Sequence, residues 1–187
     1  MHFGEAAAER LDRPERETFL PAEGILSLLS EGLVLADIGA GTGFIAFPAA
    51  RTAKKVYAID ISDAMVDILK RRVAERHVAN LVPLLSTVEK IPLPDASVDA
   101  ALSVSCFHDY EDETTVAETA RILKPRGLFL VVDWDADAEP GRRVPGPPLG
   151  VRKTTEQVIG TCGRSGLSLE SRGRLNEDVF TLLFRKN

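Results

Sequence analysis

Several absences in this chain of 187 residues exclude whole classes of protein. Only two cysteines occur, Cys106 and Cys162, and they form no Cys-x-x-Cys pair, so we expect no structural zinc or other metal site and a reduced, cytoplasmic setting. No apolar run approaches the roughly 20 residues that span a membrane. The N-terminus is polar and acidic, which is unlike a secretory signal peptide. We therefore expect no membrane association.

The chain also lacks basic character. Its formal net charge is −5 and it contains no long basic run. Binding to a nucleic-acid backbone needs several cations on one face, so nucleic acid is not an expected partner. Apolar residues make up 44% and charged residues 27%, as in ordinary globular proteins. The length predicts one domain over residues 1–187, with residues 1–20 as an N-terminal arm or lid and residues 21–187 as the core.

Strand-like and helix-like segments alternate along the core. This alternation predicts an α/β fold, with a doubly wound, Rossmann-like, mostly parallel sheet and helices on both faces. Two final strands joined by a short turn predict an antiparallel pair at one edge. Residues 124–127 are expected to turn between a helix and a strand, and Ser62 is expected to cap a helix. The expected strands are 33–38, 54–60, 81–85, 97–103, 128–133, 167–173 and 179–184, and the expected helices are 22–30, 43–52, 62–77, 111–123 and 154–164.

Residues 33–43 carry the most informative pattern, an aliphatic strand that runs directly into glycines at alternate positions. Gly39, Gly41 and Gly43 lack a Cβ atom, so the backbone can turn tightly and a ligand can approach it closely. The following helix offers unpaired N–H groups at its start. The spacing differs from the Gly-x-Gly-x-x-Gly that holds a dinucleotide pyrophosphate. The pattern therefore favours nucleotide binding but disfavours an NAD-dependent oxidoreductase.

Two further segments are expected at the same edge of the sheet. Asp60 ends the second strand, 17 residues past Gly43, where an acidic side chain can accept hydrogen bonds from ribose hydroxyls. Residues 85–89 end the third strand and can border an adenine ring. Because ligands of open parallel sheets bind beyond the carboxyl ends of the strands, these features predict an adenosine-containing ligand.

Four segments in this order resemble class I S-adenosylmethionine-dependent methyltransferases, in particular the small UbiE-like or type 11-like methyltransferase domains. The resemblance runs from about residue 20 to the C-terminus, and its motifs are residues 35–43, 58–62 with Met65, 91–99 and 121–127. It implies a seven-stranded sheet in the order 3-2-1-4-5-7-6, with the last strand antiparallel. It also implies S-adenosyl-L-methionine as the cofactor and S-adenosyl-L-homocysteine as the product.

The resemblance further implies which residues hold the cofactor. Asp37 and the backbone of Gly39 would meet its methionine part, and Asp60 would bind both ribose hydroxyls. Ile61 would pack on the adenine, and the Ser103 carbonyl would help to hold the methionine amine. The full expected set is Asp37, Gly39, Ala40, Gly41, Gly43, Asp60, Ile61, Thr87, Val88 and Ser103.

One position departs from the family pattern. The family usually has an acidic residue and then a small one before Glu-Lys-Ile-Pro, where this chain has Thr87-Val88. The Val88 N–H would still reach an adenine ring nitrogen. Thr87 can accept one hydrogen bond from the adenine amino group, but an uncharged acceptor is weaker than a carboxylate.

Candidates for the methyl acceptor's side of the site follow later strands. His108 lies just beyond the fourth strand and is the candidate catalytic base, because its titration range suits proton transfer near neutral pH; the alternative is a local structural hydrogen bond. Trp134 could stack on a flat substrate or simply pack at the edge. Arg152 could hold an anionic substrate group or be surface charge. Phe3, with His2, could belong to an N-terminal lid.

These features predict an S-adenosylmethionine-dependent methyltransferase that acts on a small molecule, with specificity set by the N-terminus and residues 135–150. A non-catalytic, Rossmann-like protein that binds the cofactor or a partner remains an alternative, and an NAD-dependent oxidoreductase is a weaker one. RNA methylation is disfavoured by the acidic charge and by the sequence Ser-Val-Ser-Cys at 103–106, where an Asn/Asp-Pro-Pro-aromatic motif would stand. The acceptor and the oligomeric state stay open.

Overall fold

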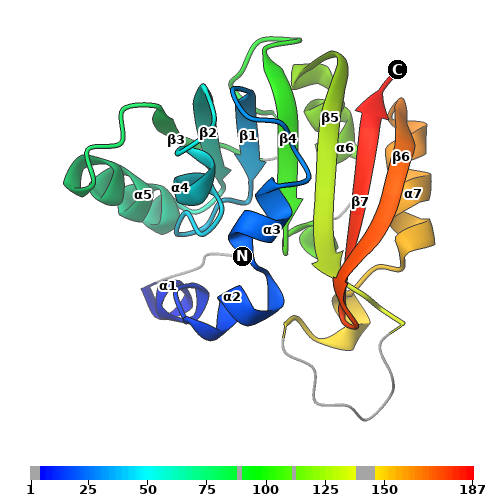
Figure 1. Ribbon diagram of the computed structural model, residues 1–187, viewed down its shortest axis with the longest axis horizontal. Helices are drawn as coiled ribbons and strands as arrows, with labels where there is room; N and C mark the ends of the chain where they lie inside the picture. Colours follow the sequence, from blue (N-terminus) through cyan, green and yellow to red (C-terminus); the bar gives the residue numbers. More distant parts are fainter. Residues whose placement is uncertain (1–4, 88–89, 111–112, 138–145) are drawn as a thin grey trace.

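A computed structural model describes residues 5–87, 90–110, 113–137 and 146–187, and its strands form one twisted sheet (Figure 1). The strands are β1 (Val34–Ile38), β2 (Lys55–Asp60), β3 (Leu81–Leu85), β4 (Val98–Val104), β5 (Leu123–Trp134), β6 (Leu167–Asn176) and β7 (Val179–Lys186). Their order is β3-β2-β1-β4-β5-β7-β6. The first five are parallel, and β7 is antiparallel to both of its neighbours. The predicted fold class and strand order are confirmed.

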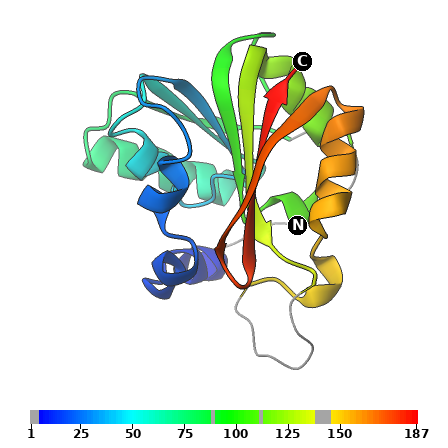
Figure 2. The same ribbon diagram turned by 45° about the vertical axis from the view of Figure 1, so that its right-hand side comes forward.

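Helices cover both faces of this sheet. Figures 1 and 2 show α3, α4 and α5 on one face and α6 and α7 on the other. The helices of the described chain are α1 (Glu5–Leu11), α2 (Glu15–Phe19), α3 (Ala22–Leu26), α4 (Ala46–Ala49), α5 (Asp63–Glu75), α6 (Thr114–Ile122) and α7 (Thr155–Arg164), with 3₁₀ turns η1 (Phe107–Asp109) and η2 (Leu149–Val151). No helix in the described ranges is long and apolar enough to cross a membrane.

The two helical layers enclose two hydrophobic cores, because successive side chains of a strand point to opposite faces. Leu35 packs with the cluster under α3, α4 and α5, whereas Ala36 and Ile38 pack with the cluster under α6 and α7. β4 alternates in the same way at Ala101 and Leu102. Burial on both faces explains why the inner strands read as nearly continuous apolar runs.

Several helices are shorter than the sequence predicts. The helix expected over 22–30 ends at Leu26, and the one expected over 43–52 is reduced to α4, because residues 41–45 form turns after the glycines. Pro48 fits as the third residue of α4, where its missing N–H has no intrahelical partner to lose. The expected Ser62 side-chain cap is wrong: Ser62 is the N-cap residue of α5, but its side chain makes no capping bond.

The turn expected over residues 124–127 is an irregularity inside β5 rather than a separate connection. β5 begins at Leu123, immediately after α6, and Val98 pairs with Leu123 while Ala100 already pairs with Leu128. Residues 124–127 therefore lie opposite a single residue of β4, Asp99. This excess of chain is accommodated by Arg126, whose φ of 63° lies in the left-handed region.

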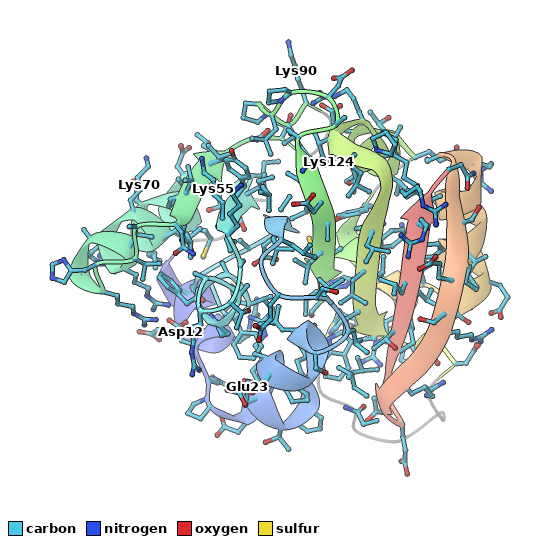
Figure 3. All side chains as sticks on the ribbon, turned by 45° about the horizontal axis from the view of Figure 1, so that its top comes forward. Asp12, Glu23, Lys55, Lys70, Lys90 and Lys124 are labelled. Carbon is cyan, nitrogen blue, oxygen red and sulfur yellow. The ribbon has the colours of Figure 1, made fainter. Side chains whose placement is uncertain are left out.

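The N-terminal arm, α1 and α2, lies beyond the carboxyl ends of β1 and β4 (Figure 1). Leu11 packs with Met65 and Ile68 of α5. Asp12 forms an ion pair of 2.5 Å with Arg72 of α5. Figure 3 shows Asp12 on this arm, at the end of the molecule opposite Lys55 and Lys124. The arm is thus placed over the edge at which the sequence predicts the ligand.

Candidate cofactor and acceptor site

The glycine turn after β1 has a backbone that only glycine adopts without strain. Gly39, Gly41 and Gly43 have φ values of 75°, 55° and 92°. A Cβ atom on Gly39 would lie 2.2 Å from the Cys106 sulfur, and one on Gly43 would lie 2.6 Å from the ring of Phe47. The N–H groups of Gly39 and Ala40 both donate to the Ile59 carbonyl, which holds the turn against β2. With Leu11 of the N-terminal arm 3.2 Å from the position of a Cβ on Gly41, side chains pack closely against all three glycines of the turn.

Asp60, at the end of β2, closes this turn from the other side. Its Oδ2 accepts a hydrogen bond of 2.7 Å from the Gly41 N–H, and its Oδ1 accepts one of 2.9 Å from the Ser62 N–H. Burial raises the pKa of Asp60, and these backbone bonds oppose the rise. Beside it, Ile61 and Leu85 are 48% and 49% exposed at the ends of β2 and β3. Acidic and apolar groups thus meet where a nucleoside is predicted.

Asp37, at the end of β1, is buried without full hydrogen bonding. Within the described residues neither its Oδ2 atom nor the Thr42 hydroxyl has a hydrogen-bond partner. Burial raises the pKa of Asp37 to about 7; Arg16 and the Ala46 N–H lower it, whereas Asp60 raises it further. An unsatisfied buried polar group costs about 1–3 kcal/mol. A ligand that brings a cationic donor would recover this cost, so these residues fit the amino-acid end of the expected cofactor.

His108 is held over the ends of β4 and β5 by a single carboxylate. The left-handed Ser105, with a φ of 54°, turns the chain from β4 into η1. The His108 N–H then donates to Asp133 Oδ2 at 2.9 Å, and its ring Nδ1 lies 2.9 Å from Asp133 Oδ1. Because an ionised carboxylate only accepts hydrogen bonds, we assign the proton to Nδ1. Nε2 lies 3.6 Å from Asp109 Oδ2 and is left to accept a proton.

The environment of His108 raises the pKa of its imidazole above the ordinary value of 6.5. Burial alone would lower it, but the hydrogen bond and the charge of Asp133, together with the charge of Asp109, outweigh burial. Asp133 is 2% exposed and also accepts a bond of 2.8 Å from the Trp134 N–H. Sequence reasoning missed Asp133 as the partner of His108. Its available signal was its place at the end of the strand that neighbours β4.

Trp134 and Arg152 lie at this edge, but both are engaged within the protein. Trp134 is 4% exposed, donates from Nε1 to Ser105 Oγ at 3.0 Å, and lies 6.1 Å from the Phe19 ring. The Arg152 guanidinium lies 5.4 Å from the indole centroid, and its Nε donates to the Pro147 carbonyl at 3.0 Å. These contacts match the packing alternative for Trp134 and bury Arg152. Roles for both in substrate binding stay predictions.

The remaining predicted residues fall into two groups. Ser103 is buried and accepts a hydrogen bond of 3.0 Å from Tyr110, which the sequence had not indicated; it lies beyond Leu102, where the pairing of β4 with β1 ends. Thr87 is exposed after β3. Val88 and Phe3 lie outside the described residues. In the described ranges no group of three or more His, Cys, Asp or Glu side chains could hold a metal ion.

Residues 36–131 match the family model of a methyltransferase domain. The chain belongs to this methyltransferase family. The resemblance to class I S-adenosylmethionine-dependent methyltransferases is thereby confirmed, with S-adenosylmethionine as the cofactor of the class.

Individual relatives agree with this membership. The chain is 36% identical to an uncharacterized methyltransferase of Mycobacterium tuberculosis over 146 residues, 78% of this chain and 53% of that protein. It is 32% identical over 111 residues to the ubiquinone/menaquinone biosynthesis C-methyltransferase UbiE of Methylobacterium nodulans, covering 57% of this chain and 44% of the relative. This chain thus spans about half the length of these curated relatives. The crystal structure of an S-adenosylmethionine-dependent methyltransferase from Aquifex aeolicus superposes with a TM-score of 0.90 at 26% identity, covering 99% of this chain and all of the other.

Proposed function

We propose that this methyltransferase transfers the methyl group of S-adenosylmethionine to a small-molecule acceptor from which His108 removes a proton. The observation that carries the proposal is that two complementary groups of residues lie at one edge of the sheet. One is the glycine turn with the unpartnered Asp37 Oδ2, and the other is the pair of His108 and Asp133. The cofactor, when bound, supplies an electrophilic methyl group on a sulfonium.

For the cofactor, Asp37 binds the amino group, because it is the buried carboxylate that lacks a partner at Oδ2. The glycine turn at residues 39–43 borders the methionine part, and the Ser103 carbonyl assists in holding its amine. Asp60 binds the ribose hydroxyls, since a carboxylate has about four acceptor sites and the Gly41 and Ser62 N–H groups occupy two of them. Ile61 offers apolar surface to the adenine, whose polar edge is left to Thr87 and Val88.

On the acceptor side, His108 Nε2 takes the proton as the nucleophile loses it. Asp133 holds Nδ1, fixes the tautomer and stabilises the imidazolium that results. The buried position of this pair keeps its orientation fixed before the acceptor arrives, and orientation of reactants can supply roughly 7–11 kcal/mol in favourable systems. An acceptor whose nucleophile carries a removable proton, such as a hydroxyl, fits this chemistry.

A small acceptor is supported by what surrounds the site. The described part of the arm, α1 and α2, lies over it (Figure 1), and Arg152, which follows η2, stacks on the Trp134 ring. We assign acceptor selection to these two segments and the action of a lid to the arm. The two free thiols, Cys106 and Cys162, support a cytoplasmic setting.

The proposal is tested by ligand binding followed by methyl transfer. In a thermal-shift assay S-adenosylhomocysteine should raise the melting temperature and NAD should not. Transfer of labelled methyl from S-adenosylmethionine into a metabolite library should then reveal the acceptor. The His108→Ala variant should bind S-adenosylhomocysteine as the wild type does but lose transfer. Stabilisation by NAD alone would refute the cofactor assignment, and unchanged transfer by His108→Ala would refute the base.

A further inference from the structure

Arg16, on α2 of the N-terminal arm, is a half-buried cation that forms no ion pair with the described residues. Its guanidinium stacks on the Phe44 ring, with 4.4 Å between the guanidinium carbon and the ring centroid. Its Nη1 makes one long hydrogen bond of 3.4 Å to the Leu11 carbonyl. Across the ranges the structure covers, no carboxylate lies within ion-pair distance of it, whereas Arg72 on the facing helix pairs with Asp12. Partial burial of an unpaired charge is costly, which points to a missing partner.

Arg16 lies beside the glycine turn, because its guanidinium stacks on Phe44, the residue that follows Gly43. Burial lowers the pKa of Arg16, and the negative charges of Asp37 and Asp12 oppose that change. In return, the charge of Arg16 lowers the pKa of Asp37. Arg16 and Asp37 thus both lie at the glycine turn, and among the described residues they form no hydrogen bond with one another and Asp37 Oδ2 has no partner. A cation and an anion separated in this way complement an α-amino-acid zwitterion placed between them.

We propose that Arg16 binds the α-carboxylate of the cofactor's methionine part, opposite the ammonium group held by Asp37. The inference rests on the proposed function and deepens it. A guanidinium suits a carboxylate because it can donate two parallel hydrogen bonds. Phe44 follows the glycine turn directly, so the stacking contact places the Arg16 guanidinium beside that turn.

The arm thereby contributes a binding group and not only a cover. The position of α2 depends on contacts on either side of it, the Asp12 ion pair with Arg72 and a hydrogen bond of 2.9 Å from Asn176 to the Phe19 carbonyl. Binding of the cofactor carboxylate would add a third attachment between them. Ligands that carry the carboxylate should therefore slow hydrogen exchange in α2, and ligands that lack it should not.

The test compares S-adenosylmethionine with its decarboxylated analogue, which keeps the amine and the adenosine. Isothermal titration should show that Arg16→Gln lowers the affinity for S-adenosylmethionine by about 10- to 100-fold, as expected for loss of charge-assisted hydrogen bonds. The decarboxylated analogue should bind the variant within about twofold of wild type. Arg76→Gln is the matched control, because Arg76 stacks on Phe47 at the same 4.4 Å but is the C-cap residue of α5 and not part of the arm. It should leave both affinities unchanged.

The outcomes separate this inference from the proposed function. An equal loss for both ligands in Arg16→Gln would show that Arg16 only supports the arm and would overturn the inference. Unchanged affinities would overturn it as well. A wild type that binds neither ligand would refute the proposed function itself. Should Arg16→Gln unfold, Arg16→Lys serves in its place: it keeps the charge but loses the fork, so its loss should again be confined to the ligand with the carboxylate.

Discussion

The two halves of the carboxyl edge differ in how their buried polar groups are satisfied. In the half formed by β1 and β2, Asp37 Oδ2 and the Thr42 hydroxyl have no hydrogen-bond partner in the described chain. In the half formed by β4 and β5, His108, Asp133 and Trp134 are joined to one another or to Ser105. Under the proposed function, the amino group of the cofactor would complete the first half. In the second half, the polar groups named above are already hydrogen-bonded within the protein. This suits a general base that must keep its orientation with any acceptor.

The prediction with the largest expected effect tests the internal hydrogen bonding of the second half. Asp133→Asn should lower the turnover number by about 10²- to 10⁴-fold, because an amide can donate to Nδ1 and so allow the wrong tautomer. The affinity of this variant for S-adenosylhomocysteine, measured by titration, should equal that of the wild type. Asp109→Asn serves as the comparison: Asp109 is exposed on the Nε2 side, so its loss should lower the pKa of His108 but keep the tautomer that Asp133 fixes. Wild-type activity should rise with pH through the His108 pKa, above 6.5, as the base loses its proton. Full turnover by Asp133→Asn would refute this role.

The second prediction concerns the place where the two halves touch. Gly39→Ala should lower the free energy of unfolding by about 2–5 kcal/mol, combining left-handed strain with a clash against Cys106, 2.2 Å from the new Cβ. Gly32 has the same φ of 75° but nothing within 4 Å, so Gly32→Ala should lose only about 1–2 kcal/mol. Urea denaturation of both variants measures the difference. Equal losses would mean that Cys106 does not hold the halves in contact.

The third prediction uses the pH dependence of the first half. The Asp37 pKa is raised from 3.8 to about 7, so between these values the folded state holds a proton that the unfolded state has released. Stability without cofactor should therefore fall as pH rises through this range. Binding of an ammonium favours the ionised carboxylate, so affinity for S-adenosylmethionine should rise by up to about tenfold per pH unit below pH 7.

Titration in buffers of different ionisation enthalpy should detect the proton that Asp37 releases on binding. Asp37→Asn should remove this release. Arg16 stays charged over this pH range, so it contributes no pH dependence of its own to the affinity. A wild-type affinity that is constant between pH 5 and pH 7 would contradict an ammonium site at Asp37.

The same contrast between the halves explains what could be predicted from the sequence. The first half was predictable because backbone geometry dictates residue type: left-handed φ values require Gly39, Gly41 and Gly43 at fixed spacing. The parallel sheet was predictable because its strands are buried on both faces. The strand order, by contrast, entered with the family resemblance rather than from periodicity. Helix lengths after the glycine turn failed because residues 41–45 form turns, which local propensity does not show.

The second half could not be derived in the same way. His108 and Asp133 are 25 residues apart, and the bond between them depends on the left-handed turn at Ser105. Arg16 reaches the site from an arm whose position is set by ion pairs and packing rather than by a motif. Many residue types can form such contacts, and the segments that they join are far apart in the sequence. No residue type at a fixed spacing therefore predicts them.

The smallest expected effect decides whether Trp134 belongs to the substrate surface or to the fold. Trp134→Phe removes the indole bond to Ser105 but keeps an aromatic ring against Phe19, so unfolding should become easier by about 0.5–1.5 kcal/mol. Ser105→Ala removes the same bond from the other partner, and the double variant should lose little more than either single one. If the second half is complete by itself, KM for the acceptor stays at the wild-type value in all three variants. A rise in KM confined to Trp134→Phe would instead place the indole against the acceptor, because only that variant changes the ring that the acceptor would meet.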